Sequence, residues 1–283
     1  MIKPADRSVL ITGCSSGIGR CLADGLKTRG YRVFATARKP ADVEALTAAG
    51  FHGVPLELTS SESIHRAVDT VLARTGNTLY ALINNAGYGQ PGAVEDLSRE
   101  ALRVQFETNL FGPHELTARL LPVFRAQNGG RIVQISSLFG ILCLPYRGAY
   151  NASKFALEAL SDTLRLELRG SGIYVSLIEP GPIDTRFRDG SYAAYQSTID
   201  PNRSVHRAQY QALERRLRGD RASPLKLPPT AVLRKVVRAL EARRPSARYR
   251  VTLPTHTFAL LKRVLPDRIL DALLSAIGGG GAR

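Results

Sequence analysis

The stretch Thr12-Gly13-Cys14-Ser15-Ser16-Gly17-Ile18-Gly19 decides the fold of this chain. It follows the apolar run Ser8-Val9-Leu10-Ile11 and precedes residues 20–26, in which apolar side chains recur with helical spacing. The order is therefore strand, glycine-rich turn and helix. Glycines allow a tight turn and a close approach of backbone to a pyrophosphate, and a helix start offers N–H groups and the positive end of a dipole. The spacing Gly-x-x-x-Gly-x-Gly departs from the commoner dinucleotide fingerprint, so this stretch alone is also compatible with a simple turn.

Apolar runs that alternate with helical patterns predict a parallel sheet. The strands are expected at residues 8–12, 32–35, 53–58, 79–83, 131–135 and 173–179. Repeated strand and helix units of this kind place helices on the faces of a parallel sheet. The chain has 283 residues, a length that such folds often use without dividing. We therefore expect an α/β fold in a single domain that covers residues 1–283.

Two of the expected strands run into small polar residues. Leu82-Ile83 leads into Asn84-Asn85-Ala86-Gly87, and Arg131-Ile132-Val133-Gln134-Ile135 leads into Ser136-Ser137. Open α/β sheets bind ligands at the carboxyl ends of their strands. We expect these polar groups to meet the glycine-rich turn at one edge of the sheet, although a serine at this position also suits the cap of a helix or turn.

The segment Tyr150-Asn151-Ala152-Ser153-Lys154 places a phenol and an ammonium group four residues apart, on one face of a helix. A tyrosine titrates near pH ~10, and a nearby positive charge favours its phenolate. Lys154 is therefore expected to lower the pKa of Tyr150 toward the range that is useful for proton transfer. The same spacing also occurs on solvated helix faces, so the pair gains its weight from the segments described above.

In order and spacing, these segments, together with Asn109 and Pro180-Gly181, resemble the short-chain dehydrogenase/reductase family over roughly the first 190 residues. Within that family the chain looks most like the reductases of steroids, retinoids and lipid-like aldehydes. The resemblance implies a single-domain, doubly wound Rossmann fold with a parallel sheet of about seven strands flanked by helices. One departure is Glu57, which stands where the family more often has an aspartate near the adenine.

The resemblance assigns four residues to catalysis. Tyr150 would pass a proton to or from the substrate oxygen while hydride moves to or from the nicotinamide, and Ser137 would hydrogen-bond that oxygen. Lys154 would bind the nicotinamide ribose and lower the pKa of Tyr150. Asn109 would help to hold its helix and a water in a proton relay.

The cofactor contacts that the resemblance implies follow the glycine-rich turn and the ends of the later strands. They are Gly13, Ser15, Ser16, Gly17, Ile18, Gly19, Arg38, Glu57, Leu58, Asn85, Ala86, Gly87, Tyr150, Lys154, Pro180, Gly181, Ile183 and Thr185. No metal is expected, because the five histidines are scattered and the three cysteines lack metal-ligand spacing.

The second expected strand continues into Phe34-Ala35-Thr36-Ala37-Arg38-Lys39. Sites for NAD usually place a carboxylate here for the ribose hydroxyls. No acidic residue occurs between Arg29 and Pro40, and the guanidinium of Arg38 can pair with a 2′-phosphate. The sequence therefore favours NADP(H) over NAD(H), with an ordinary surface role for Arg38 as the alternative.

The substrate is expected to be apolar, because residues 138–146 offer an almost uncharged surface directly after Ser137. Residues 186–226 are long, polar and weakly periodic, like the substrate lid of the family. We therefore predict an NADP(H)-dependent oxidoreductase acting on an apolar aldehyde, ketone or alcohol. A catalytically idle dinucleotide-binding sensor or scaffold is the alternative, although it would not need Ser137, Tyr150 and Lys154 together. A sugar-nucleotide epimerase would have a different glycine spacing and usually a longer C-terminus.

Basic residues are concentrated near the end of the chain. Residues 201–283 carry 18 Lys and Arg against 5 Asp and Glu, or +13 of the net +15. Such an excess suits an anionic partner such as a membrane surface, and it equally suits a solvated basic face. Nucleic acid is not expected as a partner, because the region lacks a recognition motif and interleaved aromatic residues.

A C-terminal extension is expected at residues 251–283, and it contains an apolar helical stripe. The stripe comprises Ile269, Leu270, Leu273, Leu274 and Ile277. Packing on its own domain is the leading interpretation, with a substrate lid, an oligomer contact and a membrane surface as alternatives. We expect a homo-oligomer and keep peripheral contact with an anionic membrane as a hypothesis.

The expected location is the cytoplasm, with or without contact to a membrane surface. Residues 1–7 lack an apolar signal region, and the sequence contains no uninterrupted apolar stretch of about 18 residues. Its three cysteines, an odd number, suit a reducing compartment.

Overall fold

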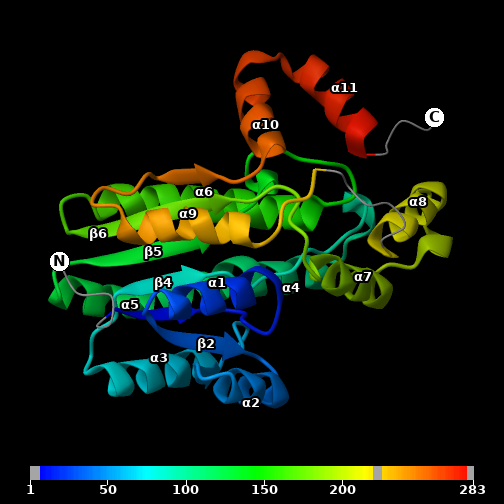
Figure 1. Ribbon diagram of the computed structural model, residues 1–283. Helices are drawn as coiled ribbons and strands as arrows, with labels where there is room; N and C mark the ends of the chain where they lie inside the picture. Colours follow the sequence, from blue (N-terminus) through cyan, green and yellow to red (C-terminus); the bar gives the residue numbers. More distant parts are fainter. Residues whose placement is uncertain (1–6, 219–224, 279–283) are drawn as a thin grey trace.

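The computed structural model describes residues 7–218 and 225–278, and within them the chain forms one parallel sheet of seven strands. The strand order is β3-β2-β1-β4-β5-β6-β7 (Figure 1). The strands are β1 Ser8–Ile11, β2 Arg32–Ala37, β3 His52–Pro55, β4 Ala81–Asn84, β5 Gly130–Ile135, β6 Ile173–Glu179 and β7 Arg248–Arg250. The predicted doubly wound α/β fold is therefore confirmed.

Each of the six strands expected from the sequence is present, with bounds that shift by at most three residues. The largest shift is in β3, which ends at Pro55 instead of residue 58. Proline has no N–H to continue a strand ladder, and β3 lies at the edge of the sheet, where proline is tolerated. The short strand β7, Arg-Tyr-Arg, was not among the strands expected, because three residues are too few for a periodic signal.

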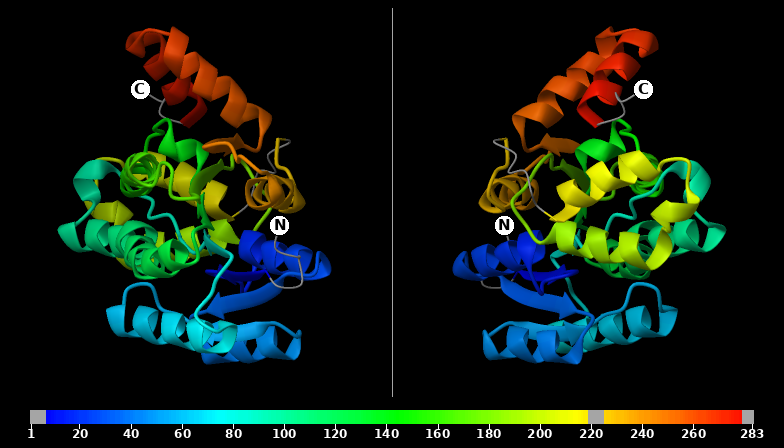
Figure 2. Two further views of the ribbon diagram at one scale, coloured as in Figure 1. Left: turned by 90° about the vertical axis from the view of Figure 1, so that its left-hand side faces the viewer. Right: turned by 90° about the vertical axis from the view of Figure 1, so that its right-hand side faces the viewer.

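Helices cover both faces of the sheet (Figures 1 and 2). One face packs on α1 Gly17–Thr28, α2 Pro40–Ala48 and α9 Thr230–Glu241, and the other on α3 Ser61–Thr75, α5 Gly112–Ala126 and α6 Gly148–Glu167. Strand β1 shows why helices must cover both faces of the sheet. Val9 and Ile11 are buried in the core on one face, and Leu10 is buried in the core on the other. Successive side chains of a strand point to opposite faces, so an unbroken apolar run needs cover on both.

The strand order reverses between β1 and β4, which pair directly with each other. Helices connected to neighbouring strands diverge at such a point and leave room for a ligand beyond the carboxyl ends of the strands. The glycine-rich turn follows β1, and the segment Asn84-Asn85-Ala86-Gly87 begins in the last residue of β4. The topology therefore brings the predicted cofactor residues together.

The segment between β4 and β5 contains η2 Val94–Asp96, α4 Arg99–Phe106 and a π-helical turn, η3 Glu107–Phe111, before α5. A short 3-10 turn, η4 Leu138–Gly140, follows β5. Residues 186–218 of the predicted lid are mostly helical, with α7 Phe187–Thr198, η5 Pro201–Arg203 and α8 Arg207–Arg218, whereas residues 219–224 of that prediction lie outside the described residues. These lid helices lie beyond one end of the sheet (Figure 1) and pack together through Tyr195, Tyr210 and Leu213.

The described part of the C-terminal extension, residues 251–278, forms two helices that project from the body of the molecule, α10 Leu253–Val264 and α11 Asp267–Gly278 (Figure 2), and residues 279–283 lie outside the described residues. The expected stripe is divided in the structure: Leu270 and Leu274 are buried, whereas Ile269, Leu273 and Ile277 are exposed. The buried pair packs on leucines of the segment after Ser137. Only these two of the five residues in the stripe therefore pack on their own domain. Within the described residues, each helix is too short or too polar to cross a membrane.

Candidate active site

The glycine-rich turn closes tightly against the segment after β4. A Cβ atom at Gly13 would lie 2.9 Å from Ala86, and one at Gly19 would lie 2.0 Å from the carbonyl oxygen of Gly13. Gly17, at the start of α1, has φ +58°, a value that favours glycine. Within the part of the chain described here, the side chain of Ser16 makes no capping hydrogen bond to α1. The turn therefore fits a pyrophosphate, which would take hydrogen bonds from the uncapped N–H groups.

Two residues tie this turn to the end of β4. The hydroxyl of Thr12 accepts hydrogen bonds from the backbone amides of Asn85 and Ala86, both at 2.9 Å. The side-chain amide of Asn85 donates to the carbonyl oxygens of Thr12 at 2.9 Å and Gly13 at 3.2 Å. Asn85 and Ala86 were predicted from the sequence as cofactor residues, whereas Thr12 was not, although a small polar residue at the end of a strand was the available signal.

Tyr150 lies on α6, buried to 9% exposure between two aromatic rings. Its ring is 6.1 Å from that of Phe139, edge-on, and 5.6 Å from that of Phe187. Burial raises the pKa of Tyr150, and a hydrogen bond with the side chain of Ser137 and the charge of Arg147 oppose this increase. The expectation that Lys154 lowers the pKa of Tyr150 below its usual value is therefore wrong for this structure. Burial of the phenol has the largest effect on its pKa, and the positive charge that opposes this effect is that of Arg147.

Lys154 follows Tyr150 by one helical turn and is also buried. Its ammonium group donates to the backbone carbonyl of Ile135 at 2.8 Å and lies 5.9 Å from the centre of the Tyr150 ring. Burial lowers the pKa of Lys154 to about 8, and the negative charge of Glu158 opposes the change. Two ammonium hydrogens remain to bind a hydroxylated ligand, since an ammonium group has three donors.

Asn109 stands in the π-helical turn η3, a type of helix irregularity that often marks functional sites. Its side chain donates to the carbonyl of Tyr88 at 2.9 Å and to the hydroxyl of Ser153 at 3.1 Å, and accepts from the amide of Tyr88 at 3.1 Å. A Cβ atom at Gly87 would lie 2.9 Å from its oxygen. Asn109 therefore holds the segment after β4 against the helix that carries Tyr150 and Lys154.

Arg38 and Glu57 come together after β2 and β3. Their charged groups lie 3.7 Å apart, with the side chain of Arg38 71% exposed and that of Glu57 34% exposed. Glu57 also accepts from the amide of Thr59 at 3.2 Å. Leu58 is buried, and its carbonyl lies against Gly112. The sequence suggested separate roles for Arg38 and Glu57, whereas the structure joins them as an exposed ion pair.

The predicted residues after β6 connect this edge of the sheet to other segments. The carbonyl of Pro180 accepts from the amide of Leu138 at 2.7 Å. Thr185 lies against Gly17, where a Cβ atom would be 3.3 Å from it. Ile183 forms an isolated parallel bridge with Leu227. Gly181 is in close contact with Thr252, which leads into α10.

An open groove of about 780 Å³ starts at Gly17 and Thr185 and runs between α1 and the beginning of α9. Its lining includes Arg20, Asp24 and Leu233. Thus one end of the groove meets the residues proposed to hold the cofactor, and the rest extends along α1.

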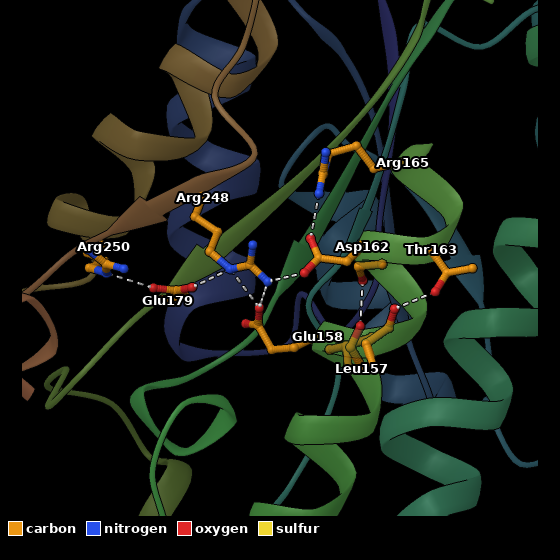
Figure 3. Close-up of polar contacts among 10 residues, drawn as sticks. Leu157, Glu158, Asp162, Thr163, Arg165, Glu179, Arg248 and Arg250 are labelled. Atoms are coloured by element: carbon orange, nitrogen blue, oxygen red, sulfur yellow. Dashed lines mark hydrogen bonds and ion pairs between the residues drawn. The ribbon is translucent and has the colours of Figure 1, made fainter. Parts of the chain in front are cut away.

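A network of ion pairs joins α6, β6 and β7 (Figure 3). Arg248 contacts Glu179 at 3.1 Å, Glu158 at 2.9 Å and Asp162 at 2.6 Å. Arg250 contacts the second oxygen of Glu179 at 3.3 Å. Glu158 is one helical turn beyond Lys154, and Glu179 is fully buried. The sequence did not predict this network, because its bonded partners are up to 90 residues apart and show no local pattern.

Among the described residues, no group of three or more His, Cys, Asp or Glu side chains could hold a metal ion. The free cysteines Cys14 and Cys21 lie in and near the glycine-rich turn, and burial raises the pKa of Cys14 to about 12. A thiol with such a pKa remains protonated and packs as a small apolar side chain.

A doubly wound sheet with a glycine-rich turn at its switch point is a dinucleotide-binding fold, and a Ser, Tyr and Lys at the same edge suit hydride and proton transfer. A family model described as short chain dehydrogenase matches residues 7–196. The chain belongs to the short-chain dehydrogenase/reductase family, whose members include oxidoreductases of retinoids and lipids.

Several characterised or named proteins resemble the chain along most of its length. Uncharacterized oxidoreductase YbbO of Escherichia coli is 47% identical over 96% of this chain and 95% of its own. The NADPH-dependent 3-dehydrocapnine reductase of Ornithobacterium rhinotracheale is 33% identical, with 94% and 95% covered. Human retinol dehydrogenase 8 is 32% identical, with 92% and 86% covered.

The fold also matches solved structures. A short chain dehydrogenase/reductase from Burkholderia phymatum, solved in complex with NAD, superposes with a TM-score of 0.78 at 26% sequence identity. The match covers 96% of this chain and 97% of that one. The predicted family and fold are confirmed by these similarities.

Proposed function

We propose that the protein is an NADP(H)-dependent oxidoreductase that interconverts an apolar aldehyde or ketone and its alcohol. The observation that carries this proposal is the buried Tyr150, hydrogen-bonded to Ser137 and one helical turn from the buried Lys154. A catalytically idle dinucleotide-binding protein would gain nothing from burying these three polar groups side by side, because burial of polar groups is costly.

The proposed mechanism assigns proton transfer to Tyr150. Burial keeps the phenol protonated, so it can donate to a carbonyl oxygen when the reaction runs toward the alcohol. The hydrogen bond with Ser137 and the charge of Arg147 stabilise the phenolate that remains. A bound nicotinamide supplies or accepts the hydride.

The cofactor would be held by three parts of the site. The uncapped start of α1 would bind the pyrophosphate, and Lys154 would bind the ribose hydroxyls next to the nicotinamide. Thr185, which lies against Gly17, would close the pyrophosphate site from the segment after β6. Residues 186–226 are proposed as a lid that excludes water from the reacting atoms.

The preference for NADP(H) is supported by Arg38, which is exposed beside Glu57 at the adenosine end of the proposed site. One relative is named as NADPH-dependent, whereas one structural neighbour was solved with NAD. The guanidinium of Arg38 can exchange its 3.7 Å contact with Glu57 for a bidentate contact with a 2′-phosphate.

Replacement Arg38→Ala is expected to weaken NADPH binding by roughly tenfold or more and to leave NADH binding almost unchanged. A hydrogen bond to a charged group contributes about 1.5–3 kcal/mol, which corresponds to that loss. Glu57→Gln should have the opposite effect on NADPH, since it removes the competing carboxylate. Cofactor affinities measured by fluorescence titration test both, with Arg103→Ala on α4 as the matched surface control. An equal loss of NADPH and NADH affinity in Arg38→Ala would refute the assignment.

The apolar substrate is supported by a leucine cluster next to Tyr150. Leu138, Leu142 and Leu144 pack with Leu270 and Leu274 of α11. This cluster lies at the segment that follows Ser137, so a substrate whose oxygen meets Ser137 would have apolar side chains beside its carbon chain.

Catalytic efficiency is therefore expected to rise with the length of a neutral aldehyde. Each methylene group that is buried contributes up to ~0.8 kcal/mol, or up to roughly fourfold in kcat/KM. The experiment compares straight-chain aldehydes of increasing length below their aggregation limits, with NADPH and then NADH. A preference for small charged aldehydes or sugars over the longest soluble chain would contradict the proposal, and turnover of none of them would favour the idle sensor or scaffold.

Homo-oligomer formation and membrane contact stay predictions. Leu260 and Val264 of α10 are exposed, as are Ile269, Leu273 and Ile277 of α11. The same two helices carry Lys262, Arg263 and Arg268 against Asp267 and Asp271. The apolar side chains thus suit either a second copy of the chain or the surface of a bilayer, and the local charge balance is much smaller than that of residues 201–283 as a whole.

A further inference from the structure

The acidic residue Glu158 lies one helical turn beyond Lys154 on α6 and is buried with it. Residues four apart on a helix share a face and are about 6 Å apart along its axis. The ammonium group of Lys154 donates to the carbonyl of Ile135 at 2.8 Å. Glu158 meets the residues that follow this carbonyl, since a Cβ atom at Gly140 would lie 2.7 Å from the hydroxyl oxygen of Ser136 and 3.3 Å from Oε1 of Glu158. The two charged side chains therefore reach the same end of β5.

The two carboxylate oxygens of Glu158 have different surroundings. Oε2 accepts two hydrogen bonds from Arg248, at 3.1 Å from Nε and 2.9 Å from Nη2. Oε1 is buried and has no hydrogen-bond partner within residues 7–218 and 225–278, and the same holds for the hydroxyl oxygen of Ser136. A buried polar atom without a partner is costly, so its position calls for a functional reason. Arg248 thus fixes the carboxylate, and the free oxygen lies on the side of Ser136, next to the carbonyl that Lys154 contacts.

The ion-pair network contains three arginines and three carboxylates. Its ion pairs are 2.6–3.3 Å long and join Arg165, Arg248 and Arg250 to Glu158, Asp162 and Glu179 (Figure 3). The charges of the network therefore cancel, and the buried Lys154 stands beside it with a charge of its own. A buried ammonium group loses its proton more readily when a neighbouring negative charge is removed. Without the carboxylate of Glu158, the network would carry a net charge of +1 next to this ammonium group.

Other elements that pack on α6 also bring charged groups. Strand β6 supplies Glu179, which two arginines neutralise. Helix α10 supplies Lys262, which donates to a backbone carbonyl at the end of η4. Helix α4 supplies Glu100 and Arg103, which pair with each other at exposed positions. Glu158 differs from these groups because it is acidic, buried and on the same helix face as the lysine.

We propose that Glu158 is a positioning residue of the active site, whose carboxylate, held by Arg248, keeps Lys154 protonated for binding the ribose hydroxyls of the cofactor. Glu158 acts through Lys154 and takes no part of its own in proton transfer to the substrate. A charge one helical turn away suits this role, because charges interact more strongly in a buried site than in water. The inference rests on the proposed function, and it gives the ion-pair network a role in cofactor binding in addition to its role in stability.

The experiment measures the NADPH affinity of the whole protein by fluorescence titration at a series of pH values. The wild type is expected to lose affinity as the pH rises through the pKa of Lys154, which burial lowers to about 8. In Glu158→Gln, which removes the charge and keeps the size, this loss should occur at a pH lower by roughly one unit or more. Glu158→Asp retains the charge and should lie closer to the wild type. Arg248→Met removes a positive charge from the network and should move the loss to higher pH.

Asp162→Asn is the matched control. Asp162 contacts the same guanidinium group at 2.6 Å, and its side chain is 34% exposed. It is eight residues from Lys154, or about 12 Å along the helix axis, so its charge is both more distant and more screened. Its replacement should leave the pH profile of NADPH affinity unchanged. In a Lys154→Ala protein, Glu158→Gln should have no further effect on the profile, because the group on which Glu158 acts is absent.

A Glu158→Gln profile that coincides with that of Asp162→Asn would overturn the proposal, as would a wild-type affinity that does not fall with rising pH. The readout is binding, so it does not depend on turnover. If Glu158→Gln shifts the profile but no carbonyl compound is reduced, the proposed oxidoreductase function fails and the positioning role stands. If aldehydes are reduced and the profile does not shift, the proposed function stands and the positioning role is wrong.

Discussion

Replacement Tyr150→Phe is expected to reduce turnover by roughly 10²–10⁴-fold, the range that general acid–base catalysis contributes, and to leave cofactor affinity nearly unchanged. Phenylalanine keeps the ring between Phe139 and Phe187 and removes only the hydroxyl group that hydrogen-bonds with Ser137. Turnover is measured with a neutral long-chain aldehyde, and NADPH binding with the same protein samples. Tyr174→Phe near the opposite end of the sheet is the matched control, because that residue lies early in β6.

Lys154→Ala is expected to differ from Tyr150→Phe by damaging both turnover and cofactor binding. Its ammonium group would lose the contact with the ribose hydroxyls, at a cost of roughly tenfold in affinity. Burial lowers the pKa of Lys154 to about 8, so the wild type should lose affinity as the pH rises through that value, and Lys154→Ala should not show this loss. A Tyr150→Phe protein with near-normal turnover would rule out the proposed proton donor.

Replacement Arg248→Met is expected to lower the free energy of unfolding by about 3–5 kcal/mol, the range for removing one partner of a buried ion pair. Arg248 contacts Glu179, which is fully buried, and Glu158, whose side chain is 9% exposed (Figure 3). Without the guanidinium group, Glu179 would lose the closer of its two arginine partners, and Glu158 would lose the arginine that contacts it. Urea unfolding of the two proteins measures the difference.

The loss should depend on pH in a defined direction. Burial raises the pKa values of Glu158 and Glu179, while Arg248 opposes the rise. In Arg248→Met the folded-state pKa values would rise further, so the folded protein binds more protons than the unfolded chain and its stability falls as the pH rises. The destabilisation should therefore be smaller at pH ~5 than at pH ~8.

The control for Arg248 lies in the same network. Arg165 pairs with Asp162 at 3.0 Å, but both side chains are about one third exposed. Exposed pairs contribute about 0–1 kcal/mol, so Arg165→Met should have a much smaller effect. If the two replacements lower the unfolding free energy equally, the buried position of Glu179 does not matter in the way we describe.

Much of the fold was accessible from sequence, because it depends on local patterns. The run Ile173–Glu179 was predicted with the bounds that the structure has, since seven largely apolar residues between turn residues define a buried strand. The glycine-rich turn was equally clear, and its closeness to Ala86 requires a glycine at residue 13. Strand β7 was missed because Arg-Tyr-Arg is short and polar, and it becomes a strand only by pairing with β6.

The functional residues were only partly accessible. Tyr150 and Lys154 could be paired from their spacing, since a helix fixes which residues share a face. The environment of Tyr150 could not be predicted. Burial raises the pKa of the phenol, and the charge that opposes this increase comes from Arg147. The extent of burial depends on Phe139 and Phe187, which belong to other segments of the chain.

The sequence by itself determined the alternation of strands and helices, the edge of the sheet where the ligand residues gather, and the family resemblance. Only the tertiary structure decided that Arg38 meets Glu57, that Arg248 meets Glu179, and that Arg147 stacks on the Phe139 ring beside the proposed proton donor. The physical reason is one of range. Strand and helix signals arise between residues a few positions apart, whereas ion pairing and burial depend on distances that exist only after the sheet and its covering helices have closed.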